Sequence, residues 1–179
     1  VPRVQGLIAE RWHALGGAFG RLGYPTSDEL RLSGGDLSRF QGGYVYWSPP
    51  TGAHAVWGEI LKSYGAQKWE RGPLGYPTSD ELRLSGGALS RFQGGYIYWS
   101  PSTGAHRVSG PILAVYGSQK WERGGLRYPT SDQITLAGGA LNRFQGGYIY
   151  WSPTTGAHWV AGSILQAYRS QGYERGALG

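Results

Sequence analysis

The sequence predicts an α+β repeat protein in which each unit of about 52 residues forms one short helix and one small antiparallel β-meander. The first observation is repetition, because residues 74–125 match residues 22–73 at 42 of 52 positions and residues 126–177 match residues 74–125 at 36 of 52. The second is a change of periodicity inside each unit, from a helical stripe to short runs separated by glycine pairs. A unit of this size cannot bury a large core alone, so we expect neighbouring units to share one.

The repeat boundaries define the domain organisation. They give a partial repeat at 1–21 and repeats at 22–73, 74–125 and 126–179, the last ending with the first two residues of another repeat. Because the chain begins at Val1 and stops inside a repeated motif, we expect a processed product or a fragment of a longer protein.

Each unit contains one helical stripe. Val56, Ile60 and Tyr64 recur at intervals of four residues with Leu61 beside them, which predicts one apolar helix face. Pro111 falls in the first turn of the third such segment, where a helix tolerates it. We expect helices at about 6–15, 58–70, 110–122 and 162–174.

A polar segment, GYPTSDE, opens each full repeat. Thr26 and Glu29 fit a capping box, in which the threonine side chain caps a turn and the glutamate reaches back to it. The spacing recurs in the other repeats. The aspartates between these residues, Asp28, Asp80 and Asp132, are therefore expected to cap turns or a short helical turn.

Short strands with turn signals between them complete the unit. In the first repeat they are expected at 30–32, 38–41, 44–48 and 53–56. Side chains alternate along a strand, so Val45 and Trp47 share one face, and Tyr44 and Tyr46 share the other. Because isoleucine replaces Val45 in the other copies, we expect the Val45 face to be the core and the tyrosine face to be exposed.

The chain is basic, with a net charge of +6 and 17 Arg and Lys residues, only 3 of which are Lys. Arginine suits planar contacts with carboxylates and phosphates. Charge alone would permit nucleic-acid binding. We do not expect a nucleic-acid partner, because there is no basic run and acidic residues lie near many of the arginines.

Composition excludes some further classes of protein. There is no Cys and no Met, so disulfides and thiolate metal sites are excluded. No apolar run is long enough for a membrane span.

The strings LGYPTSDE, RFQGGYIYWSP and TGAH, followed by the V-x-G-x-I helix, resemble the LGFP repeat over essentially the whole chain. The tetrad itself is LGYP at 22–25 and 74–77, and LRYP at 126–129. The resemblance implies an exported, cell-wall-associated protein of actinobacteria, with repeats that anchor linked enzymes such as mycolyltransferases, esterases or peptidoglycan amidases. It also implies units arranged around a pseudo-symmetry axis, as a propeller-like ring or an open arc.

Each full repeat carries one Arg, one Gln, two Tyr and one His on neighbouring predicted strands. Aromatic rings suit the C–H faces of sugars, while Arg, Gln and His can hydrogen-bond hydroxyl groups. We therefore expect repeated shallow sites that bind a wall polysaccharide, arabinogalactan or peptidoglycan, multivalently. The candidate ligand-binding residues are Arg39, Gln41, Tyr44, Tyr46, His54, Arg91, Gln93, Tyr96, Tyr98, His106, Arg143, Gln145, Tyr148, Tyr150 and His158.

Other functions have weaker support in the sequence. Three equivalent histidines around an axis could hold a metal ion, and Asp28 beside Glu29 could act as paired carboxylates for glycoside hydrolysis. The third copy has Gln133 in place of the glutamate, so we expect no enzyme activity. Each histidine is expected to hydrogen-bond within its own unit or to face a ligand, so we expect no metal, and no cofactor is expected either. The alternative function is a protein-interaction or assembly scaffold, whose partner is a linked catalytic domain or another repeat chain.

Overall fold

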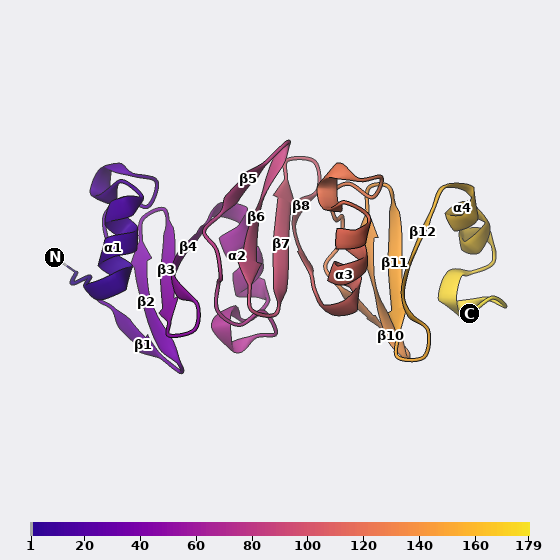
Figure 1. Ribbon diagram of the computed structural model, residues 1–179, viewed down its shortest axis with the longest axis horizontal. Coiled ribbons are helices and arrows are strands. Elements are labelled where there is room, and N and C mark those ends of the chain that lie inside the picture. The colour runs from indigo at the N-terminus through magenta and orange to yellow at the C-terminus, as the bar shows by residue number, and fades with distance from the viewer. Residues whose placement is uncertain (1) are drawn as a thin grey trace. The chain divides into compact units, whose positions relative to one another are not determined.

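A computed structural model describes residues 2–179, and in it each full repeat forms a four-stranded sheet followed by a helix (Figure 1). The first sheet comprises β1 (Leu30–Leu32), β2 (Gly35–Phe40), β3 (Gly43–Ser48) and β4 (Gly52–Trp57). The second comprises β5 (Leu82–Leu84), β6 (Gly87–Phe92), β7 (Gly95–Ser100) and β8 (Gly104–Val108). The third comprises β9 (Ile134–Leu136), β10 (Gly139–Phe144), β11 (Gly147–Ser152) and β12 (Gly156–Ala161). Strands pair in chain order, so the predicted meander is confirmed.

The helices begin where the sequence predicts and end earlier. They are α1 (Gly6–Ala14), α2 (Gly58–Ala66), α3 (Gly110–Ser118) and α4 (Gly162–Ser170). Each is followed by a short 3₁₀ turn: η1 (Gly17–Phe19), η2 (Trp69–Arg71), η3 (Trp121–Arg123) or η4 (Tyr173–Arg175). The expected range 58–70 is too long because Lys68 takes a left-handed conformation, with φ of 69°, which ends the helical path before η2.

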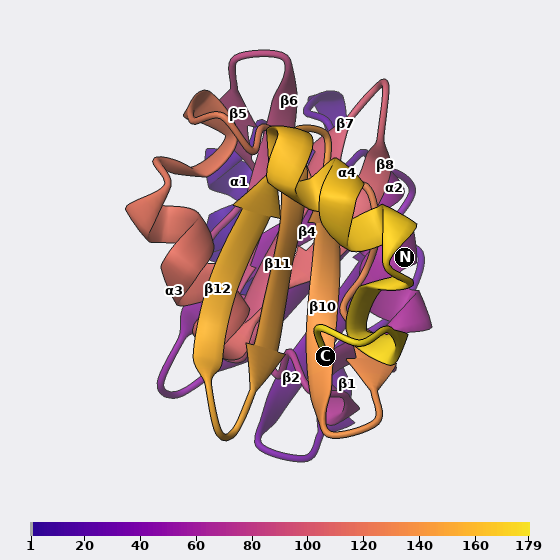
Figure 2. The same ribbon diagram turned by 90° about the vertical axis from the view of Figure 1, so that its right-hand side faces the viewer.

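The chain divides into two compact units, Val1–Ala105 and His106–Gly179. In the first unit, α1 packs on one face of the first sheet, and α2 packs on its other face and against β7 of the second sheet (Figure 1). In the second unit, α3 and α4 both contact β11 and β12, and Figure 2 shows α4 lying across the third sheet. Each unit is therefore built from alternating layers of helix and sheet. The ring or arc arrangement of the repeats stays a prediction.

The expectation that the tyrosine face is exposed is wrong for the first sheet. Val45 and Tyr46 are adjacent in β3 and point to opposite faces, yet their exposed fractions are 0% and 1%. Val45 packs with Ile8 of α1, while Tyr46 packs with Tyr64 of α2. Because α1 covers one face of the first sheet and α2 covers the other, Val45 and Tyr46 of the central strand β3 are both buried.

The capping-box prediction is also wrong, because residues 26–29 form no helix. Pro25 pairs with Phe40 in an isolated bridge, and the Thr26 N–H donates a hydrogen bond of 2.8 Å to the Arg39 carbonyl. The segment is thus an extended strand-like edge on β2. Asp28 and its counterparts are left to bond elsewhere in the structure.

An aromatic side chain on each helix is tethered to the tetrad that follows. The Tyr64 hydroxyl donates to the Gly75 carbonyl at 2.7 Å, and Trp12 Nε1 donates to the Gly23 carbonyl at 3.0 Å. The equivalent bonds, both 2.7 Å, run from Tyr116 to Arg127 and from Tyr168 to Gly179. These bonds hold the tetrad backbone in place under its helix.

Arg127 occupies a tetrad position that is glycine in the other repeats. Its φ of 55° lies close to the 68° of Gly23 and the 63° of Gly75, so the turn survives the substitution. A Cβ on Gly75 would lie 2.6 Å from Gln93 Oε1. In the third repeat the matching hydrogen bond, from the Tyr128 N–H to Gln145 Oε1, is 3.2 Å long, against 2.8 Å for Tyr76 and Gln93. Arg127 therefore carries local strain.

We predict that Arg127→Gly stabilises the chain by about 0.5–1 kcal/mol, because relief of the left-handed strain exceeds the entropy that glycine adds to the unfolded state. The free energy of unfolding from urea titration measures the effect. The reverse change, Gly75→Arg, serves as the matched control and should destabilise. Equal stability of all three chains would contradict strain at this position.

Candidate functional site

The structure separates the candidate residues into four groups, and the first comprises the tyrosines that face the core. Tyr46 and Tyr98 are core residues, whereas Tyr150 in the third repeat is half-buried. Burial is the main cause that raises the pKa of Tyr46 far above its usual value, and the negative charge of Glu70 adds to it. Burial and Glu174 act in the same way on the pKa of Tyr150. The expected exposure is therefore wrong for Tyr46 and Tyr98.

The glutamines hold the tetrads. Gln41 Oε1 accepts a hydrogen bond of 2.9 Å from the Tyr24 N–H, and Gln93 and Gln145 accept from Tyr76 and Tyr128. The backbone N–H of each glutamine also donates to the carbonyl of the same tyrosine, at 3.0 Å in each repeat. The glutamine carbonyl oxygens thus already bond to the protein.

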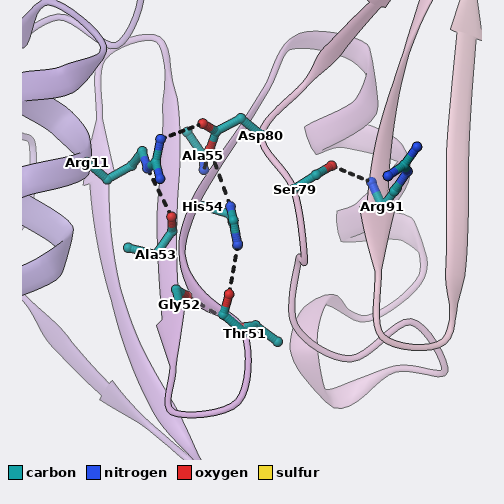
Figure 3. A network of polar contacts seen from close by, with 9 residues as sticks. All are labelled: Arg11, Thr51, Gly52, Ala53, His54, Ala55, Ser79, Asp80 and Arg91. Atoms are coloured by element: carbon teal, nitrogen blue, oxygen red, sulfur yellow. Dashed lines mark hydrogen bonds and ion pairs between the residues drawn. The ribbon is translucent and has the colours of Figure 1, made fainter.

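The histidines link one repeat to the next. In Figure 3, His54 lies between the Thr51 carbonyl and the Asp80 carboxylate of the following repeat. Its Nε2 is 2.8 Å from the Thr51 oxygen, and its Nδ1 is 3.7 Å from Asp80 Oδ1. Both facing atoms are oxygen acceptors, and the contact of Nδ1 with Asp80 is longer than a hydrogen bond. The same Oδ1 accepts the Ala55 N–H at 2.8 Å.

Arg11 of α1 completes this network around Asp80. Its Nη1 lies 3.1 Å from Asp80 Oδ2, and its Nε donates to the Ala53 carbonyl at 3.1 Å (Figure 3). The nearby Arg91 is drawn in Figure 3 for a separate contact, in which its backbone N–H donates to Ser79 Oγ at 3.0 Å. Asp80 therefore joins the helix of the partial repeat, the last strand of the first repeat and the edge of the second.

The second unit contains a related network. Asp132 Oδ1 accepts the Arg107 N–H at 2.8 Å and lies 3.7 Å from His106 Nδ1. Asp28 Oδ1 accepts a hydrogen bond of 2.6 Å from the Arg3 backbone N–H. Pro2 stands where the other copies have histidine. His158, in the last repeat, is exposed, and its Nε2 lies 2.7 Å from the Thr155 carbonyl. His54 and His106 are thus junction residues in the structure.

The protonation of the aspartates is coupled to these contacts. Burial alone would raise the pKa of Asp80, but His54, the Ala55 N–H and the charge of Arg11 together lower that pKa below its usual value. Burial is likewise outweighed at Asp132, where His106 and the Arg107 N–H lower the pKa. Because the pKa of each aspartate is lower in the folded chain than in the unfolded chain, its ionised form stabilises the fold at pH values above the unfolded-state pKa. This stabilisation is lost as the pH falls through the folded-state pKa.

We predict that Asp80→Asn lowers the free energy of unfolding by about 1–2 kcal/mol at pH 7, since it removes charged hydrogen bonds. The deficit should shrink as the pH falls below about 4 and the parent carboxylate takes up its proton. Urea titrations across this pH range measure both.

Asp132→Asn and Asp28→Asn are the matched controls for this prediction. The side chain of Asp132 is 44% exposed, against 22% for Asp80, so solvent should screen its contacts more. We therefore expect the cost to fall in the order Asp80, Asp132, Asp28. A deficit for Asp80→Asn that does not change with pH would contradict the account.

The fourth group is a repeated pair of arginine and tyrosine, directly opposite each other on neighbouring strands. The Arg39 guanidinium lies over the Tyr44 ring at 5.7 Å, and the distance is 5.6 Å for Arg91 with Tyr96 and for Arg143 with Tyr148. The arginines are exposed and the tyrosines half-buried. These six residues, the Arg–Tyr pairs, are the predicted site residues that the fold does bring together at its surface.

The Arg–Tyr pairs extend to an aromatic residue that follows the next helix. The Tyr44 ring stacks on Trp69 at 5.6 Å, and the Tyr148 ring stacks on Tyr173 at 6.1 Å. Much of the Tyr44 face and of the Tyr148 face is therefore covered by protein. What remains available to a ligand is the guanidinium group and the ring edges, so the flat aromatic platform expected from the sequence is not present in this form.

A depression of about 160 Å³ lies beside the third Arg–Tyr pair. Its lining includes Arg143, Tyr148, Tyr150, Tyr173, Glu174 and Arg175. Two guanidinium groups, a carboxylate and three phenol rings therefore meet at one shallow surface. This set can donate and accept hydrogen bonds over a small area.

The sequence analysis missed Trp69, Glu70 and Arg71 and their counterparts. The recurring W/Y-E-R-G run, which follows each of the last three helices, was the signal that could have found them. The Glu70 side chain is almost buried and lies 3.6 Å from Arg71 Nε. Its position explains why this carboxylate raises the pKa of the surrounding tyrosines.

Among residues 2–179, no group of three or more His, Asp or Glu side chains is arranged to hold a metal ion. Within the same part of the chain, none of the helices has the length and apolar character needed to cross a bilayer.

Comparison with known proteins agrees with the repeat boundaries seen in the geometry. The model of one family, the LGFP repeat, matches residues 22–72, 74–124 and 126–176. No curated protein sequence matches the chain.

Proposed function

The chain belongs to the LGFP repeat family, and from this premise we propose that it is a repeat module of a cell-surface protein that anchors to the cell envelope. In this proposal it acts outside the cell without catalysis and binds a wall polysaccharide, arabinogalactan or peptidoglycan. The binding is spread over several shallow sites.

The observation that carries the proposal is the recurrence of the Arg–Tyr pair at one register position in all three sheets. A guanidinium group offers several N–H donors in a fixed plane, which suits sugar hydroxyl and carboxylate oxygens. The neighbouring ring edges add apolar contact. A polymer with a repeated sugar unit can meet this chemistry more than once along its length.

The small size of the sites favours multivalent binding over one strong site. The depression beside Arg143 measures about 160 Å³, whereas pockets that enclose a small ligand are usually about 300–1,000 Å³. Weak sites that engage one polymer together can gain roughly 10²–10⁴ in avidity. Repetition therefore supplies the affinity that each site lacks.

Asp28, one of the two carboxylates that could serve hydrolysis, and its neighbour Ser27 have structural partners, which supports a non-catalytic role. Ser27 Oγ accepts the Arg39 N–H at 3.2 Å and donates to the Asp28 carbonyl at 2.8 Å. Asp28 accepts the Arg3 N–H at 2.6 Å. These groups are committed to the edge of the sheet.

A scaffold that binds another protein is the second candidate. It is favoured by the exposed apolar side chains of Ile164 and Leu178 at the C-terminal end of the second unit. A linked catalytic domain or another repeat chain would be the partner.

The test is retention of the chain on purified actinobacterial walls, with arabinogalactan present or removed. We predict retention on at least one of these walls, and loss of most of it when Arg39, Arg91 and Arg143 are all changed to Gln. A second triple variant, Arg31→Gln, Arg83→Gln and Arg127→Gln, removes the same charge elsewhere and should retain binding.

Retention only on walls with arabinogalactan would identify that polymer as the ligand, and equal retention would point to peptidoglycan. If neither wall retains the chain, or both triple variants lose binding alike, the polysaccharide proposal is wrong. The scaffold would then be the better account.

A further inference from the structure

The arginines of the Arg–Tyr pairs carry positive charge that the protein does not balance. In the part of the chain that the structure describes, no carboxylate forms an ion pair with Arg39, Arg91 or Arg143. Several arginines elsewhere are balanced, as Arg31 is by Asp36, whose Oδ1 lies 3.1 Å from the arginine Nε. An exposed and unbalanced charge therefore recurs at one position of each full repeat.

The paired tyrosine covers one side of each guanidinium group and leaves its edge open. The Arg39 group lies 5.7 Å from the centre of the Tyr44 ring, and the Arg143 group lies 5.6 Å from the centre of the Tyr148 ring. Within residues 2–179, neither guanidinium donates a hydrogen bond to the protein. Its N–H edge is the part that can hold a carboxylate or phosphate through two parallel hydrogen bonds.

Further arginines gather around the third Arg–Tyr pair. Arg175 lines the same depression of about 160 Å³ as Arg143, and Glu174 is the one carboxylate among its lining residues. Burial raises the pKa of Tyr173, and the positive charges of Arg169 and Arg143 act against this rise. Both of these guanidinium groups therefore lie close to the Tyr173 ring. The charge of the cluster stays positive after the glutamate is taken into account.

The first repeat carries a related cluster with less charge. Arg71 follows the tryptophan that stacks on the first Arg–Tyr pair, and its side chain is 79% exposed. Glu70 Oε1 lies 3.6 Å from the Arg71 Nε, so this second arginine is partly balanced. Gly65 stands at the position of Arg169. Arginine next to an aromatic stack is thus common to both clusters, and only the surplus of charge differs.

On the premise of the proposed function, we propose that the Arg–Tyr pairs are oxyanion sites and that the wall polymer they bind is anionic. A carboxylate or phosphodiester group of the polymer lies against the open guanidinium edge, and the ring edges contact the adjoining sugar. Arg175 is a further binding residue of the third site. A neutral sugar hydroxyl cannot balance the arginine charge, so an uncharged polysaccharide is the weaker ligand.

A matched set of polymers tests the charge of the ligand. Titration calorimetry at about 0.15 M salt compares polygalacturonate with its neutral methyl ester, and adds poly(glycerol phosphate) as a phosphodiester. An exposed ion pair changes affinity about two- to fivefold. Three sites acting together should therefore favour one of the anionic polymers over the ester by about tenfold or more. The anion bound more tightly identifies the oxyanion. Equal affinity for all three polymers, or no binding to either anion, would overturn the proposal.

Single variants separate these sites from a general effect of positive charge. We expect Arg143→Gln and Arg175→Gln each to weaken binding of the preferred anion about two- to fivefold. Arg31→Gln is the matched control, because Arg31 is equally a surface arginine but already has Asp36 as its partner, and it should leave the affinity unchanged. The same loss from all three variants would show attraction to charge alone and would also overturn the proposal.

Purified walls distinguish this inference from the proposed function itself. Retention of the chain should fall after the wall carboxylates are amidated, or after its phosphodiesters are removed with hydrofluoric acid, according to which oxyanion is bound. Retention that survives both treatments together would overturn the oxyanion site and leave wall anchoring intact. No retention on untreated walls, with preferential binding of an anionic polymer in solution, would refute wall anchoring and support the oxyanion site.

Discussion

The first sheet depends on being covered by a helix on both faces, and α2, which covers one of these faces, also packs against the second sheet. Tyr64 shows the constraint in one side chain, since its ring meets Tyr46 of the preceding sheet at 5.5 Å and Phe92 of the following sheet at 4.5 Å. A repeat of this size cannot bury enough surface alone. Its stability therefore comes largely from its neighbours, as in other arrays whose repeats contact only the adjacent ones.

The same constraint determines where recognition can occur. With both faces of the first sheet occupied, its histidine and the aspartate of the next repeat lie at the junction between repeats. These residues, His54 and Asp80, join successive repeats and leave little for a ligand. The exposed arginines of the Arg–Tyr pairs remain, and they recur once per repeat. This architecture favours the proposed distributed, shallow binding over a single deep site.

The sequence predicted the repeat, the helix starts and the meander because glycine pairs and helical spacing are local signals. It could not predict the second buried face, since tyrosine serves equally in a core and on a surface. The capping box failed for a related reason: the aspartate that resembles a local cap instead bonds the backbone of another repeat.

The glycine near the end of the helix, at Gly65, was a further signal in the sequence. A Cβ there would lie 2.6 Å from the Trp69 ring, and Gly117 stands in the same relation to Trp121. Where the glycine is replaced, by His13 or Arg169, the partner position holds Gly17 or Tyr173 instead of tryptophan.

The central claim is that binding is shared among equivalent Arg–Tyr pairs, and its most direct test is the affinity for wall polysaccharide as the pairs are removed one, two and three at a time. The account predicts that any single Arg→Gln change weakens binding to the polymer to a similar extent, that each further change weakens it again, and that short oligosaccharides bind far more weakly than the polymer. Loss of all binding from one particular repeat, with the other two silent, would contradict shared recognition. Equal affinity for a monosaccharide and for the polymer would contradict avidity.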